Sequence, residues 1–485
     1  MSSRERGWTL AIVSIALFMV VLDNLVVSIA LPSIRRDLGA SLGALEWTVN
    51  AYVLTYAVLL LTGAALGDRF GRKRVFITGL AIFTICSAAA ALAPSSAFLI
   101  GARALQGSGA AIATPLTLTL LAEAFPGRRR GLALGVWSGV SGTAVAMGPL
   151  VGGAVVEGIS WHWIFWINVP IGLLLLPLAA AQLRESRGPS ARLDGGGLAL
   201  ASAGLFALVY GLIRAQRIGF AAGEVEGCLA AAIVLLTAFI AYERRTAEPM
   251  LPLGFFARRA FAVTNVASLG MYFGMFGSIF FLTQFMQLVL HNRPLEAGLK
   301  VLVWTGATMV VSPIAGVLAP RVGSRRLIFA GLALQAGALA AFALLAGTRT
   351  AFAPLIGPFL MAGGGMGLVF APAANAILSS VRSEQAGQAS GATNAIREVG
   401  GVLGVSVLAT VFTAAGSYAT GQGFVSGLQS ALWVGAAVVG AAALVVAAFP
   451  FASRAVGGRS GGEAACGGEG RRSVGCRRPV GVAGG

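Results

Sequence analysis

The sequence predicts an all-α polytopic membrane protein with fourteen transmembrane helices, arranged as two six-helix bundles with two further helices between them. The 485-residue chain is 57% hydrophobic and only 11% charged, whereas soluble domains carry about 25% charged residues. Apolar runs of about 20 residues, long enough to cross a hydrocarbon layer of about 30 Å, recur along the chain. Stretches of the first half also reappear in weaker form in the second half.

The apolar runs are continuous rather than alternating, which favours helices over a closed barrel. The 67 glycines suit helices that pack closely within a membrane. The seventh and eighth spans are short and are separated by a polar loop with Glu224 and Glu226, and without them the count falls to twelve or thirteen. The expected spans are 9–31, 46–66, 75–93, 97–122, 131–156, 162–183, 194–213, 227–242, 261–289, 298–319, 327–346, 353–380, 395–415 and 428–450.

Most of the 35 Lys and Arg residues lie in segments on one side of this alternation. Because cytoplasmic loops carry an excess of Lys and Arg, both termini are expected in the cytoplasm. The net charge of +17 therefore indicates topology and contact with anionic lipid rather than nucleic-acid binding. The Gly- and Arg-rich segment 453–485 is expected to be a disordered basic tail.

An internal repeat predicts the division of the chain. The stretch 63–74 has a weaker copy at 316–326, and the surroundings of Pro115 have an echo around Pro372. Such duplication is typical of alternating-access transporters, whose substrate site lies near the midplane between the repeats. We expect an N-terminal bundle, two inserted helices and a C-terminal bundle at 1–190, 191–245 and 246–452.

Two ionisable side chains, Asp23 and Arg103, are the only ones expected clearly inside the apolar region. A charge at a helix centre costs on the order of 3 kcal/mol in a membrane, so such residues are functional candidates. A carboxylate removed from water can bind and release a proton near neutral pH, and Asp23 could equally attract a cationic substrate. A permanent ion pair with Arg103, or a hydrogen-bonded helix clamp, is the structural alternative.

The stretch from Arg103 to Gly109 places Arg103 and Gln106 on one helix, with glycines that permit close packing. The guanidinium cannot lose its proton, so Arg103 is a fixed positive charge that could tune Asp23 or a relay water. An anchor for backbone carbonyls is the other interpretation.

Two further stretches predict moving parts. Asp68 follows the second span at a helix C-terminus, where the dipole disfavours an anion, so it needs basic neighbours or a facing helix N-terminus. This predicts a latch between the halves, with Asp68, Arg69, Gly71 and Arg72 as the gating loop. In the fifth span, proline kinks the helix and glycines allow tight contact, which singles out Gly148, Pro149, Gly152 and Gly153.

Several of these stretches together resemble the fourteen-helix drug:proton antiporters of the major facilitator superfamily (EmrB/QacA type). Residues 22–32 resemble the first-helix motif of these antiporters, and residues 67–74 resemble the loop motif of the superfamily. Residues 103–110 resemble the proton-linked motif, and residues 148–153 resemble the antiporter motif. Residues 161–172 resemble the sequence at the entry to the sixth helix in this branch.

The resemblance implies the major facilitator fold and proton-coupled export of small hydrophobic or cationic compounds by alternating access. It implies that Asp23 carries the proton or cation, that Arg103 assists coupling, and that Asp68 with Arg72 gates. The expected partners are an amphiphilic or cationic small molecule, protons and the bilayer of a bacterial inner membrane, with the protein as a monomer. The proton gradient supplies the energy, and no metal or other cofactor is expected. A dedicated exporter of an endogenous secondary metabolite and a nutrient importer of the same fold are the alternatives.

Candidate cavity residues are amide and aromatic side chains within the spans, which suit bulky amphiphiles. They are Asn24, Asn50, Tyr52, Tyr56, Gln106, Asn265, Tyr272, Gln284, Gln287 and Asn375, with Phe273, Phe276 and Phe280. An enzyme is not expected, because the two histidines, His162 and His291, fall at outer loops and no catalytic motif accompanies them.

Overall fold

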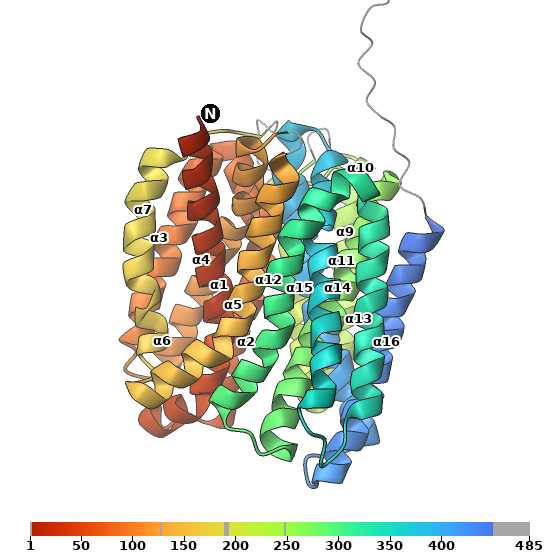
Figure 1. The fold of residues 1–485 in the computed structure, drawn as a ribbon. Coiled ribbons are helices and arrows are strands. Elements are labelled where there is room, and N and C mark those ends of the chain that lie inside the picture. Colours follow the sequence, from red (N-terminus) through yellow and green to blue (C-terminus); the bar gives the residue numbers. More distant parts are fainter. Residues whose placement is uncertain (1, 127–128, 189–193, 247–248, 450–485) are drawn as a thin grey trace, which may run out of the picture. The chain divides into compact units, whose positions relative to one another are not determined.

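A computed structural model of the chain describes residues 2–126, 129–188, 194–246 and 249–449 (Figure 1). Residues 452–485 form a unit of their own. They lie outside the described residues, so the expectation of a disordered tail stays a prediction.

All regular structure in the described ranges is helical. The elements are α1 (Ser3–Leu38), α2 (Leu42–Phe70), α3 (Arg72–Ala91), α4 (Ser96–Ala124), α5 (Arg129–Gly158), α6 (Trp163–Trp166), α7 (Asn168–Gln182), α8 (Gly195–Ile218), α9 (Gly223–Glu243), α10 (Gly254–Ala257), α11 (Arg259–Gln284), the π-turn η1 (Phe285–Val289), α12 (Pro294–Val322), α13 (Ser324–Leu345), α14 (Ala353–Ser379), the 3₁₀ turn η2 (Ser383–Gln385), α15 (Ala386–Ala415) and α16 (Gly421–Ala448).

The number of membrane spans agrees with the sequence. Among the described residues, thirteen helical segments are long and apolar enough to cross a membrane. α5 makes a fourteenth when its two arms, which meet at 41° between Val145 and Leu150, count as one span. The bend falls at the Gly148–Pro149 step, where a proline removes a backbone hydrogen bond. The prediction of an all-helical membrane protein with about fourteen spans is confirmed.

The predicted span 162–183 is present as one candidate span, Trp163–Gln182, in which Ile167 separates α6 from α7. Two other predicted boundaries are wrong. Glu224 and Glu226 do not lie in a loop but in the first turn of α9, where the helix dipole favours acidic side chains. α15 begins at Ala386 rather than at 395. Its first turns are rich in small and polar residues, so their hydropathy is low, and packing against other helices stabilises them.

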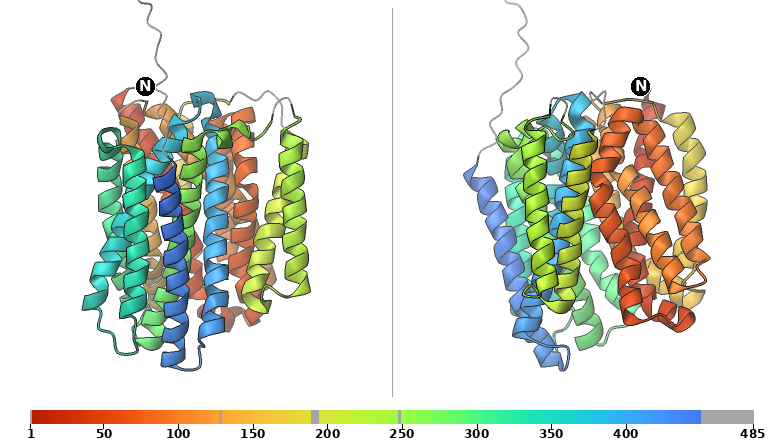
Figure 2. Two further views of the ribbon diagram at one scale, coloured as in Figure 1. Left: turned by 90° about the vertical axis from the view of Figure 1, so that its right-hand side faces the viewer. Right: turned by 180° about the vertical axis from the view of Figure 1, so that it is seen from behind.

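The two largest hydrophobic clusters organise the helices. One joins α1–α5, α7 and α8 and also includes residues of α14 and α15, and the other joins α11–α16. We refer to α1–α7 as the N-terminal helices and to α11–α16 as the C-terminal helices. The pair α8 and α9 lies on the outside, with α8 packed on α2 and α15 (Figure 2).

The N-terminal and C-terminal helices meet mainly along two helix pairs, α5 with α12 (Figure 1) and α2 with α15, with smaller contacts of α5 with α14 and of α4 with α15. On α5, a Cβ atom at Gly135 would lie 2.6 Å from Pro313 Cα of α12. One at Gly131 would collide with the backbone of Gly316. Small residues thus allow the two helix backbones to approach closely, as is common between membrane helices.

Candidate functional site

Asp23 of α1 lies in a closed polar cluster within the N-terminal helices. Its side chain is 1% exposed and forms an ion pair with Arg103 of α4, which is fully buried. Its Oδ1 also accepts hydrogen bonds from Gln106 Nε2 at 3.0 Å and from Asn168 Nδ2 at 2.7 Å. The carboxylate therefore has a partner on each oxygen.

Arg103 is held from several sides. Its Nη1 also donates to Gln106 Oε1 at 2.8 Å, its Nε donates to the Thr48 carbonyl at 3.3 Å, and its guanidinium lies 4.1 Å from the Tyr52 ring centre. The ion pair and the carbonyl contact, both considered as structural alternatives from the sequence, are thus present in this conformation. The proton role of Asp23 stays a prediction.

Asn168 of α7 and Ser87 of α3 complete this cluster, and sequence reasoning missed both. Asn168 Nδ2 donates to Ser87 Oγ at 3.2 Å, and Gln106 Nε2 donates to the same oxygen at 2.6 Å. A signal for Asn168 was available, because it is the one amide in a run of apolar and aromatic residues.

Glycines bring α4 against its neighbours and so position Arg103 and Gln106. A Cβ atom at Gly109 would lie 2.6 Å from Phe83 N and 2.7 Å from Gly79 O of α3. Replacing Gly109 with alanine is therefore expected to lower the free energy of unfolding by about 1–3 kcal/mol through overpacking. The thermal unfolding midpoint of the purified protein measures this. Gly101→Ala on the same helix, with nothing within 4 Å, is the control and is expected to leave the midpoint unchanged or raise it. Equal losses in both variants would contradict the packing argument.

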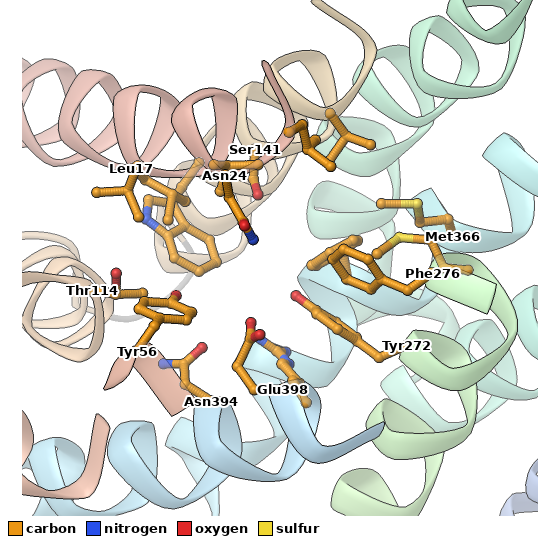
Figure 3. Close-up of a pocket in the computed structure, with 18 of the residues that line it drawn as sticks. Leu17, Asn24, Tyr56, Thr114, Ser141, Tyr272, Phe276, Met366, Asn394 and Glu398 are labelled. Atoms are coloured by element: carbon orange, nitrogen blue, oxygen red, sulfur yellow. The ribbon is translucent and has the colours of Figure 1, made fainter. Parts of the chain in front are cut away.

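A second site, the central cavity, lies between the N-terminal and C-terminal helices. It is lined from α1, α2, α4 and α5 on one side and from α11, α14 and α15 on the other. Figure 3 shows Asn24, Tyr272 and Glu398 pointing toward the same space. Its volume of about 50 Å³ admits only a few water molecules, each of which needs about 10–15 Å³. Drug-sized ligands occupy pockets of about 300 Å³ or more, so the cavity is contracted in this conformation.

The structure brings only part of the predicted cavity set together. Asn24, Tyr52, Tyr56, Tyr272 and Phe276 line the cavity. Gln106 lies in the Asp23 cluster instead, and the amides of Asn265 and Gln284 donate to carbonyls of their own helix. The remaining candidates do not line the described cavity; they are Asn50, Gln287, Asn375, Phe273 and Phe280. Residue type alone did not reveal which helix face is turned inward.

Two charged residues of α15, Arg397 and Glu398, line the cavity, and the sequence analysis missed them. The expectation that Asp23 and Arg103 are the only deep ionisable side chains is therefore wrong. The error follows from the late predicted start of this helix at residue 395, which left Arg397 and Glu398 in its first turn, near the membrane surface. With α15 beginning at Ala386, they lie several turns inside it.

The predicted gating loop joins the N-terminal helices to α15 at the upper end of the bundle in Figure 1. Arg72 donates from Nε to Asp68 Oδ1 at 2.8 Å, from Nη2 to the Glu384 carbonyl at 2.8 Å, and from Nη1 to Glu123. The Asp68 carboxylate lies against Gly387, at the N-terminus of α15, where the helix dipole stabilises an anion. Asp68 thus has both kinds of partner that its position required.

Other members of this loop differ in their surroundings. Arg69 is exposed and lies over Phe70. Gly71 has φ of +111°, and a Cβ atom there would lie 2.7 Å from the carboxyl carbon of Glu185. Glu185, which sequence reasoning missed, accepts from the backbone N–H groups of Lys73 at 3.0 Å and Arg74 at 3.2 Å. It therefore caps the first turn of α3 and holds the loop in place.

The glycines of the predicted antiporter motif pack α5 on α1. Cβ atoms at Gly148 and Gly152 would each lie 2.8 Å from side-chain carbons of Leu25 and Val26. A Cβ atom at Gly153 would lie 3.9 Å from the backbone nitrogen of Leu295 in α12. The side chain of Pro149 lies outside the described residues.

Comparisons with known proteins agree with this architecture. The family model of the Major Facilitator Superfamily matches residues 13–405. The tetracenomycin C resistance and export protein of Streptomyces glaucescens is 36% identical over 408 residues, which cover 84% of this chain and 76% of that protein. The multidrug resistance protein Stp of Mycobacterium tuberculosis is 35% identical over 415 residues, which cover 85% and 77%. The crystal structure of the human organic anion transporter MFSD10 is similar in fold, with a TM-score of 0.67, 13% identity, and coverage of 92% of this chain and 100% of that one.

Proposed function

The chain belongs to the major facilitator superfamily, and from this premise we propose that it is an exporter that carries small hydrophobic or cationic molecules out of the cell in exchange for protons. It is a multi-pass membrane protein of a superfamily of transport proteins. The relatives named above are export and resistance proteins, which supports export rather than uptake.

The observation that carries the proposal is the cavity between the N-terminal and C-terminal helices. Its walls hold aromatic rings, among them Tyr56, Trp137 and Phe276, and one carboxylate, Glu398. Aromatic faces and a carboxylate in a low-dielectric site attract bulky cations. Because the site lies between two helix groups, opening it to one side and then the other moves its contents across the membrane.

Proton coupling is proposed to use the carboxylates of Asp23 and Glu398. A proton on Asp23 would weaken its ion pair with Arg103, which also lies against the cavity residue Tyr52. A proton on Glu398 would compete directly with a bound cation. The proton gradient would supply the energy, without a metal or another cofactor.

Orientation and assembly are part of the same proposal. The excess of Arg and Lys in one set of loops supports an orientation with both termini on the cytoplasmic side of a bacterial inner membrane. The latch of Asp68 and Arg72 then closes the cytoplasmic side in this conformation. The division at 1–190, 191–245 and 246–452 is proposed as two bundles and an inserted pair, acting as a monomer in contact with lipid.

Cells that express the protein are expected to accumulate less of the cationic dye ethidium than cells with an empty vector. A protonophore should remove the difference, because it collapses the gradient that drives export. Dye fluorescence over time measures this. Efflux that persists with the protonophore would contradict proton coupling, and equal accumulation in both strains would contradict export of such cations.

Export of an endogenous metabolite is the second candidate. One relative is named for both resistance to and export of tetracenomycin C, which favours it. The extracellular metabolite profile of the source organism, with and without the gene, distinguishes the two candidates.

A further inference from the structure

Arg397 and Glu398 are the charged side chains among the described residues that line the central cavity, and they do not pair with each other. No salt bridge within 4.0 Å joins them, although they are neighbours in the sequence. The reason is helical geometry, because successive residues point about 100° apart at 3.6 residues per turn. The cavity therefore presents a positive and a negative group side by side, which attract each other but leave their hydrogen-bonding atoms open to a ligand.

Arg397 is buried without a hydrogen-bond acceptor among the described residues. It is 1% exposed, and its Nε and Nη2 have no partner. The rings of Tyr272 and Phe370 lie with their centres 5.7 Å from the guanidinium, which stabilises the cation but accepts no N–H bond. A guanidinium cannot escape this cost by losing its proton.

Arg103 differs from Arg397 in its hydrogen bonds. It is also buried and its Nη2 also lacks an acceptor, but its other N–H groups have the Asp23 carboxylate, the Thr48 carbonyl and the Gln106 amide as acceptors. Arg397 forms no hydrogen bond to a carbonyl of the described chain. A buried guanidinium whose N–H groups lack acceptors destabilises a fold, so these groups have no evident structural role where they stand.

Glu398 is likewise free of hydrogen bonds and salt bridges to the described residues. Figure 3 shows its carboxylate directed into the cavity, with the Tyr272 hydroxyl and the Asn24 amide on the opposite sides of the same space. It can therefore accept hydrogen bonds from a bound cation without breaking any contact within the protein.

We propose that the cavity is built for amphoteric cargo, an aromatic molecule whose cationic group binds Glu398 and whose carboxylate or phenolate binds Arg397. This rests on the proposed export function and narrows its substrate class. The aromatic body of the cargo lies among Tyr56, Trp137 and Phe276 once the cavity opens. Two charge-assisted hydrogen-bonding sites close together favour a ligand that carries both charges over one that carries a positive charge alone.

Two dyes with the same ring system test this. Rhodamine 110 carries a cationic xanthylium ring and a free carboxylate, and rhodamine 123 is its methyl ester and carries the positive charge alone. Fluorescence anisotropy with the full-length protein in lipid nanodiscs gives the two dissociation constants. Rhodamine 110 is expected to bind about tenfold more tightly, as one additional charge-assisted contact provides.

Arg397→Gln is expected to reduce this preference to about one, and Arg397→Lys to retain part of it, because lysine keeps the charge but not the planar fork. The control is Arg217→Gln, which makes the same change at a side chain that is 53% exposed and outside the cavity. It should keep the preference of the wild type. The thermal midpoint of Arg397→Gln should not fall, because the variant removes a buried guanidinium whose Nε and Nη2 have no acceptor. If Arg397→Gln does not fold, Arg397→Lys is the test, and it should show a smaller preference for rhodamine 110 than the wild type.

The outcomes separate this inference from the proposed function. Equal affinity for the two dyes in the wild type, or a preference that survives Arg397→Gln, would overturn the amphoteric cargo and leave cation export intact. Failure to bind either dye, with no efflux of rhodamine 123 from cells, would contradict both.

Discussion

Asp23→Asn is expected to lower the initial rate of proton-driven dye efflux at least about tenfold. A tenfold change in rate corresponds to about 1.4 kcal/mol. The asparagine oxygen can still accept the hydrogen bond of Arg103. Its NH2 group then faces the amides of Gln106 and Asn168, which donate to Asp23 in the wild type and have to turn to accept from it. The amide cannot titrate, so a step that needs a proton on this group stops. Dye efflux from energised cells, normalised to the amount of protein in the membrane, measures the effect.

Stability distinguishes a structural ion pair from a coupling site. Removing one partner of a buried ion pair costs about 3–5 kcal/mol, and the retained amide contact should keep the loss in Asp23→Asn below that. The double variant Asp23→Asn with Arg103→Gln removes both charges and should recover the thermal midpoint but not efflux. Asp37→Asn, on the same helix with a side chain 53% exposed, is the control. Efflux that returns in the double variant would reduce Asp23 to a structural role.

Glu398→Gln is expected to weaken the binding of cationic dyes at least about tenfold, because it removes the negative charge that the cavity wall presents. Glutamine has nearly the same size and shape. Since Glu398 makes no hydrogen bond or salt bridge with the described residues, the thermal midpoint should stay unchanged, in contrast to Asp23→Asn. Dye anisotropy with the protein in nanodiscs measures the dissociation constant.

The dependence on pH provides a second test of Glu398. In the wild type, protons compete with the cation for the carboxylate, so affinity should fall as the pH is lowered. In Glu398→Gln this dependence should flatten. Glu226→Gln, an exposed position in α9, is the matched control and should keep the pH dependence of the wild type. An unaltered pH profile in Glu398→Gln would exclude this carboxylate as the place where cation and proton compete.

Asp23 and Glu398 show which site residues could be predicted from the sequence and which could not. Asp23 stands in a long apolar run, so hydropathy alone singled it out, and the ion pair with Arg103 could be anticipated as one alternative. Glu398 follows a stretch of small and polar residues that reads as a loop, so the same criterion passed over it. That stretch is helical because it packs against other helices, as where Ser390 Oγ donates to the Pro115 carbonyl of α4 at 2.8 Å.

The cavity residues make the same point for helix faces. Asn24 and Gln106 are both amides within predicted spans, yet Asn24 faces the cavity and Gln106 faces Asp23. The rotation of a helix about its own axis depends on which residues its neighbours accommodate, as at Gly109 against α3. No single stretch of sequence contains that information.

The sequence by itself determined the fold class, the approximate number of spans and the deep position of Asp23 and Arg103, because hydropathy and charge are properties of local stretches. It also indicated that Asp68 needs partners, since an anion at a helix C-terminus is unfavourable, and the structure shows these partners in Arg72 and the N-terminus of α15. The gating role stays a prediction. Only the tertiary structure decided that Arg397 and Glu398 reach the cavity unpaired and that Asn168 and Ser87 complete the Asp23 cluster. These contacts join residues far apart in the chain, and they depend on how the helices rotate and pack against one another.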